Sequence, residues 1–176
     1  DCQILLTCNE GWGLTLTEAM LAGNPIIANS TGGMQDQMRF VDEKGKWIDF
    51  DADFPSNHTG RYKECGEWAI PIFPNNRSLV GSVPTPYIWD DKCTSEAISE
   101  AIKKAYDLGP EERKRRGKLG REWVMSNEAQ MTGQGMSNNV IDAFEETFIK
   151  FKKRSRFDLI KVEDRKKDYI THKLKY

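Results

Sequence analysis

The sequence predicts an α/β fold in which helices flank a parallel sheet. Residues 4–6 and 25–28 are short apolar runs, the pattern of strands that are covered on both faces. Residues 14–22 are rich in helix formers, and a short helix is expected from Met34 to about Phe40. The order strand, helix, strand, helix predicts right-handed βαβ units with helices on both faces of the sheet.

Glycines and a proline mark the ends of these elements. Residues 9–13 form a glycine-bearing turn between the first strand and the first helix. Gly23 stands where a helix C′ cap belongs, and Pro25 prevents the helix from continuing. A second loop, residues 30–33, follows the second strand and contains a Gly-Gly pair.

Residues 47–91 differ in composition from the segment before them. Prolines and aromatic residues replace the periodic hydrophobic pattern of helices and strands. We expect a long irregular excursion, with short strands at residues 68–70 and 87–89. A structureless stretch of this length is unusual in a compact domain. It is interpreted as a surface elaboration with its own small apolar core; the alternative is a role in specificity or in an oligomer contact.

Three helices are expected after the excursion. Apolar residues recur at helical spacing from Ala97 to Tyr106, a second helix is predicted from Pro110 to about Met125, and a third from about Asn138 to Lys152. The basic run at residues 113–116 lies on the second of these helices beside several glutamates. It is therefore interpreted as a solvated helix face.

The chain is expected to contain one partial domain, residues 1–149, and a basic helical tail, residues 150–176. The net charge is −1, yet the tail alone carries 11 Lys and Arg against 4 Asp and Glu. Apolar residues among these charges predict a loose amphipathic face. Two interpretations of this face stay open: it packs against another domain, or it attaches to an anionic membrane surface, with the protein peripheral to the membrane.

Composition excludes several classes of protein. No apolar run approaches the ~18–20 residues of a membrane-spanning helix, and the first residues lack the basic flank of a signal peptide, so a cytoplasmic location is expected. The four cysteines form no CxxC pair and are expected to be reduced. The body has no general basic surface for nucleic acid. Neither His58 nor His172 has partners at metal or triad spacing.

Residues 10–18 are the segment most informative about chemistry. Glu10 is expected on the loop at the carboxyl end of a parallel strand, where open α/β sheets bind ligands, and Glu18 in the first turn of the next helix. Gly11 and Gly13 allow backbone N–H groups to approach a ligand, and the positive end of the helix favours an anionic diphosphate. An equally weighted interpretation is that residues 15–18 form a capping box, in which Glu18 closes the helix.

Residues 9–29 read NEGWGLTLTEAMLAGNPIIAN and resemble the E-x7-E signature of group-1 glycosyltransferases. The similarity covers both glutamates, both loop glycines, Leu14, Gly23 and Pro25 at unbroken spacing. Residues 31–36 also resemble the family's next loop, in which a Gly-Gly pair precedes an acidic residue. Similarity over the later helices is only general.

The resemblance implies the C-terminal, donor-binding half of a GT-B fold, a partial Rossmann-like domain. It implies retaining transfer of a sugar from a nucleotide-diphosphate sugar, with no metal and no other cofactor. Glu10, as catalytic residue, contacts the donor sugar, and Glu18 contacts the ribose. The donor-binding set is completed by the loop and helix start, namely Gly11, Trp12, Gly13, Leu14 and Thr15.

The resemblance also implies groups that residues 1–176 do not include. In the family, an Arg and a Lys that hold the diphosphate lie upstream of the strand at residues 4–6, as does a whole N-terminal acceptor domain. We expect this chain alone to transfer sugar feebly, because the charge on the leaving diphosphate is poorly stabilised without those cations.

Gly32, Gly33 and Asp36 are candidate residues of the cleft. Asp36 replaces the glutamate that is usual in the family, and Gln35 stands where proline is frequent. The alternative for Asp36 is an acid that favours the helix dipole. Two other functions stay open: a nucleotide-sugar epimerase or phosphorylase on the same scaffold, and a non-catalytic module that binds nucleotide sugars or serves assembly.

Overall fold

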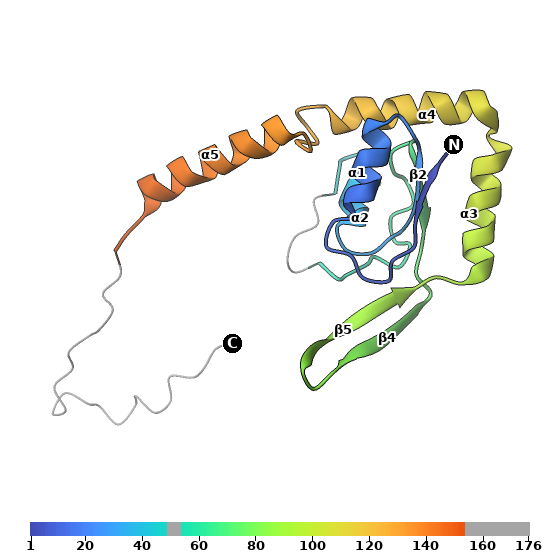
Figure 1. The fold of residues 1–176 in the computed structure, drawn as a ribbon, viewed down its shortest axis with the longest axis horizontal. Coiled ribbons are helices and arrows are strands. Elements are labelled where there is room, and N and C mark those ends of the chain that lie inside the picture. Colours follow the sequence, from blue (N-terminus) through green and yellow to red (C-terminus); the bar gives the residue numbers. More distant parts are fainter. Residues whose placement is uncertain (49–53, 154–176) are drawn as a thin grey trace. The chain divides into compact units, whose positions relative to one another are not determined.

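The computed structural model describes residues 1–48 and 54–153 (Figure 1). The chain divides into two compact units, Asp1–Ser137 and Asn138–Tyr176. The predicted α/β fold is confirmed in the first unit, which contains a three-stranded parallel sheet of Rossmann-like type. Among the described residues, no helix is long and apolar enough to cross a membrane.

The sheet has the order β1-β2-β3, with all strands parallel. β1 (Gln3–Leu5) and β2 (Ile26–Asn29) agree with the predicted strands to within one residue, and β3 (Ala69–Ile72) confirms the short strand expected near residue 69. The helix α1 (Leu14–Leu21) connects the first two strands as predicted. The strand order in the sheet follows the chain order, so each strand pairs with the next one along the chain.

Glycine and backbone geometry end the first two helices. Gly23 has a φ of 81°, in the left-handed region, and closes α1; its N–H donates to the carbonyl of Met20, so the predicted C′ cap is confirmed.

 The N–H of Asn24 donates to the carbonyl of Ala19, which completes a Schellman motif. The next helix, α2 (Met34–Met38), ends two residues before the predicted end because Arg39 adopts a left-handed conformation with a φ of 53°.

The core lies on both faces of this sheet. Ile26 and Ala28 of β2 face a cluster built mainly from α1, α2 and two tryptophans, Trp68 and Trp123, whose rings stack with centroids 4.9 Å apart. Ile27 faces the opposite side, where isoleucines of β3 pack against alanines of α3 (Ser95–Asp107). Figure 1 shows the sheet between α1 and α3. This alternation explains why the strands read as continuous apolar runs.

The helices after the excursion begin and end close to the predicted residues. Thr94 caps α3, since its hydroxyl accepts a hydrogen bond from the N–H of Ala97 at 3.3 Å. The following helix, α4 (Gly109–Val124), has a proline in its first turn as expected. Its basic run is paired with acids: Arg115 contacts Glu112 and Glu67, which supports the interpretation as a solvated face.

The expectation of an irregular excursion is corrected at its end. Two strands, β4 (Asn76–Ser82) and β5 (Thr85–Lys92), form an antiparallel hairpin, and only the part of β5 around Tyr87 was expected. β4 was missed because its residues are mostly polar and show no clean alternation. The N–H of Asp91 donates to the carbonyl of Cys8 at 2.8 Å, so the end of the hairpin is joined to the segment after β1.

The last described helix, α5 (Gly133–Lys150), begins five residues before the predicted start. Its start is capped by Thr132, whose hydroxyl accepts a hydrogen bond from the N–H of Gly135 at 3.1 Å. No residue of α5 is buried. Residues 154–176, which carry most of the predicted basic tail, lie outside the described residues.

His58 is buried in an aromatic cluster of the first unit and is expected to make stability depend on pH. Its ring lies edge-on to Phe40, with centroids 4.5 Å apart, and its side chain is 5% exposed. Burial lowers the pKa of His58 from 6.5 to about 4. Because the unfolded chain then binds the proton more tightly, stability is full above pH 6.5 and is lost as the pH falls towards 4, by about 3 kcal/mol.

Urea unfolding at pH 7.5, 5.5 and 4, on the wild type and on His58→Gln, measures this contribution. The variant should lose about 3 kcal/mol less over that range, since glutamine does not titrate. Equal losses in the two proteins would show that His58 is not the group responsible.

Candidate functional site

The segment predicted to carry the chemistry forms a loop at the carboxyl end of β1 and the start of α1. Gly13 is the N-cap residue of α1 and has a φ of 82°, a conformation that favours glycine. A Cβ added to Gly13 would lie 3.0 Å from the side chain of Leu5 and 3.3 Å from that of Met34. The loop therefore turns sharply over the core, as the spacing of its glycines predicts.

The two loops predicted to form the cleft lie in direct contact. A Cβ added to Gly32 would be 2.0 Å from the carbonyl oxygen of Glu10, and one added to Gly33 would be 2.3 Å from that of Gly11. The N–H of Gly33 also donates to the carbonyl of Glu10 at 3.4 Å. Glycine is required at both positions because the backbones approach too closely for any side chain. The structure thus brings together two predicted parts of the site.

Buried hydrogen bonds from side chains of α1 and α2 fix the position of the loop at residues 10–13. Gln37 of α2 donates hydrogen bonds from its side-chain nitrogen to the carbonyls of Trp12 and Gly13. The indole N–H of Trp12 donates to the hydroxyl of Thr17 at 3.1 Å, and that hydroxyl donates to Gln37 at 2.7 Å. Neither Thr17 nor Gln37 was predicted as a site residue. Both act on the loop as positioning residues.

The two glutamates are placed where a ligand could reach them. Glu10 is partly buried and Glu18 is exposed, and within residues 1–48 and 54–153 neither carboxylate has a hydrogen-bond or ion-pair partner. Leu14 and Thr15 are exposed and share one face of α1 with Glu18. The structure records no contact between the two carboxylates.

The capping-box interpretation of Glu18 is not supported by the helix geometry. α1 begins with Gly13 as its N-cap, and no side chain caps it. Glu18 is the fifth helical residue, beyond the reach of the N-cap N–H that a capping box requires. In the described part of the chain, the backbone N–H groups of Leu14 and Thr15 consequently have no acceptor.

Asp36 lies in the first turn of α2 and is partly buried. That position agrees with the helix-dipole alternative. No group of three or more His, Cys, Asp or Glu side chains that could hold a metal ion occurs among the described residues.

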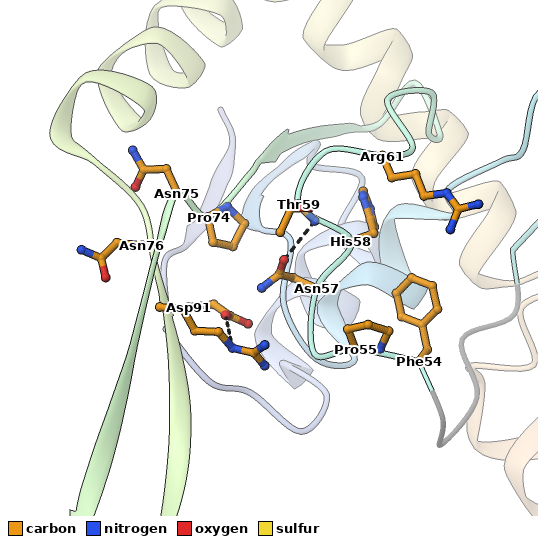
Figure 2. Close-up of a pocket in the computed structure, with 11 residues that line it drawn as sticks. Phe54, Pro55, Asn57, His58, Thr59, Arg61, Pro74, Asn75, Asn76 and Asp91 are labelled. Carbon is orange, nitrogen blue, oxygen red and sulfur yellow. Dashed lines mark hydrogen bonds and ion pairs between the residues drawn. The ribbon is translucent and has the colours of Figure 1, made fainter.

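A second polar cluster, which was not predicted, lies beside the glycine pair. Asp91 is fully buried, and one of its carboxylate oxygens accepts hydrogen bonds from the hydroxyls of Thr31 at 2.7 Å and Ser56 at 2.9 Å. The carbonyl of Ser56 in turn accepts a hydrogen bond from the N–H of Gly32 at 2.9 Å. Asp91 also borders a pocket of about 410 Å³, shown in Figure 2.

The only signal of this cluster in the sequence is the Asp90-Asp91 pair that ends an aromatic run. That signal is weak, because a carboxylate at the end of a strand is usually a surface group. The burial of Asp91 depends on hydroxyls that lie 35 and 60 residues away in the chain.

Comparison of the chain with protein-family models, with curated proteins and with solved structures found no match.

Proposed function

We propose that this chain is the donor-binding part of a retaining glycosyltransferase. In this proposal the loop at residues 10–13 and the start of α1 bind a nucleotide-diphosphate sugar. The catalytic assignment, the retention of configuration and the need for an acceptor domain depend on the resemblance to group-1 glycosyltransferases. The local geometry supports the binding part of the proposal.

One observation carries the proposal. Two carboxylates, Glu10 and Glu18, and two backbone N–H groups, those of Leu14 and Thr15, have no partner in the described residues and surround one glycine-bearing loop. Polar groups left without partners at the carboxyl end of a parallel strand are available to a ligand.

These groups suit the parts of a nucleotide-diphosphate sugar. The N–H groups at the start of α1 and the positive end of the helix favour the diphosphate. Glu18 follows Thr15 by three residues, roughly 4.5 Å along the helix axis, and a ribose adjoins the diphosphate in a nucleotide. Glu10 would accept hydrogen bonds from hydroxyls of the donor sugar. A Cβ added to Gly11 meets no atom within 4 Å, which leaves open space beside the loop.

Removing the carboxylate of Glu18 is expected to weaken donor binding. In the proposal Glu18 accepts two hydrogen bonds from the ribose, and a hydrogen bond to a charged group contributes about 1.5–3 kcal/mol. Glu18→Ala should therefore bind at least ~100-fold more weakly than the wild type. Calorimetric titration of both proteins with UDP-glucose, GDP-mannose and related donors measures the difference.

Glu122→Ala is the matched control, because Glu122 is an exposed glutamate on α4 whose one ion pair among the described residues is with Lys118 at 3.6 Å. It should bind the donor as the wild type does. If no donor produces heat with the wild-type chain, the donor-site assignment is wrong and a structural module is favoured. Equal affinities of wild type and Glu18→Ala would remove Glu18 from the site.

A further inference from the structure

The pocket beside Asp91 is lined by a buried carboxylate whose hydrogen-bonding capacity is only partly used. The second carboxylate oxygen of Asp91, Oδ1, lies 3.3 Å from Nε of Arg77 as an ion pair, but has no hydrogen bond among the described residues. The whole Asp91 side chain is excluded from solvent. A buried carboxylate oxygen with unused capacity requires an explanation, since such groups are normally hydrogen-bonded.

Asn57 supplies a donor to the same pocket. Its residue is 6% exposed, and its side-chain oxygen accepts a hydrogen bond from the N–H of Thr59 at 2.9 Å. Its side-chain nitrogen has no acceptor in the part of the chain that the structure describes. In Figure 2 this nitrogen points towards the side of the pocket where Asp91 lies.

We propose that this pocket is a second carbohydrate site, which binds a neutral sugar unit through its hydroxyl groups. The pocket offers an acceptor on Asp91 and a donor on Asn57, and a hydroxyl is the group that can serve both. Pro55 and Pro74 also line it and present apolar surface to the C–H groups of a sugar ring. The volume of about 410 Å³ lies within the range of small-molecule sites, about 300–1,000 Å³.

An anionic ligand fits the pocket less well. The charge of Arg77 is balanced by Asp91, and its guanidinium lies over the ring of Trp89, 5.5 Å from the centroid. Figure 2 shows the guanidinium of Arg61 pointing away from Asp91, so the two arginines do not converge on one ligand. The buried carboxylate would also repel a phosphate.

This site differs from the donor site, because it is formed by residues 54–61, 74–77 and 91 and not by the loop at residues 10–13. It goes beyond the proposed function and does not depend on it. Probes without a nucleotide therefore test it separately.

Saturation-transfer NMR with the methyl α-glycosides of D-glucose, D-galactose and D-mannose, and with inorganic phosphate monitored by ³¹P, tests the proposal on the full chain. At least one glycoside should receive saturation, and amide chemical shifts should change at Thr59 and Arg77. Asn57→Ser keeps a side-chain oxygen for the Thr59 N–H but lacks the amide donor. It should bind the glycoside roughly tenfold more weakly, while Asn127→Ser, at an exposed asparagine, should bind as the wild type does.

Asp91→Asn gives a second test, since asparagine has the same shape and can keep an oxygen for Thr31 and Ser56. It should also bind at least tenfold more weakly. The proposal is wrong if no glycoside binds, if shifts map outside the pocket, if both variants bind as the wild type does, or if phosphate alone binds. Because shift mapping uses the wild type, the test holds even if a variant fails to fold.

Discussion

A Gly117→Ala variant is expected to lose ~4 kcal/mol of unfolding free energy, because the added methyl group overlaps backbone atoms. Gly117 is buried on α4 where that helix crosses the turn after α1. A Cβ at this position would lie 1.8 Å from the carbonyl oxygen of Gly23 and 3.2 Å from Cα of Asn24. Both obstacles are backbone atoms of the Schellman motif, so no side-chain rotation can relieve the overlap, and α4 must move away from α1.

Urea unfolding followed by circular dichroism measures this loss. Gly133→Ala is the matched control, because Gly133 begins α5 and an added Cβ there meets no atom within 4 Å. The control should be unchanged or up to about 1 kcal/mol more stable, since alanine is the better helix former. A stability of Gly117→Ala within about 1 kcal/mol of the wild type would contradict the packing of α4 on α1 described here.

A Gly32→Ala variant is expected to separate the two loops of the candidate site. Gly32 has a φ of 53°, and its added Cβ would lie 2.0 Å from the carbonyl oxygen of Glu10. The strained backbone and the overlap together should cost about 3 kcal/mol of stability. Donor binding should be lost as well, because the loop that carries Glu10 is displaced. Urea unfolding and calorimetric titration with the donors measure the two effects.

Gly11→Ala separates these effects, because Gly11 lies in the same loop and an added Cβ meets no protein atom within 4 Å. Its stability should stay within about 1 kcal/mol of the wild type. If the backbone of the loop approaches the donor as proposed, the donor affinity of the Gly11→Ala variant should nevertheless fall. If the Gly32→Ala protein had wild-type stability and donor affinity, the close contact between the two loops would not be needed for the fold or for donor binding.

The candidate donor loop could be predicted from the sequence because its chemistry is local. Glycines 11 and 13, the two glutamates and the helix start follow one another within nine residues, and the strand before them is a short apolar run. Gly32 and Gly33 were predicted only as cleft residues. Their contact with the backbone of Glu10 and Gly11 required the structure, since the two loops are joined by no sequence pattern.

The positioning residues and the second pocket could not be predicted in this way. Gln37 reaches Trp12 across 25 residues, and Asp91 reaches Thr31 across 60. In the sequence, Gln37 and Asp91 cannot be distinguished from surface residues, because glutamine and aspartate are mostly exposed in proteins. The same holds for His58, whose altered pKa follows from the aromatic side chains packed around it.

The sequence of this protein was sufficient to predict its α/β class, its helices and the first two parallel strands, and it indicated residues 10–18 as the candidate ligand-binding segment. Those features depend on local periodicity, on glycine and proline positions and on the spacing of the glutamates. Only the tertiary structure showed that the loops at residues 10–13 and 30–33 are in contact. It also showed that Glu18 does not cap its helix and that a hairpin places Asp91 beside Thr31. These outcomes depend on the packing of distant segments, and packing is set by close contacts that no local pattern records.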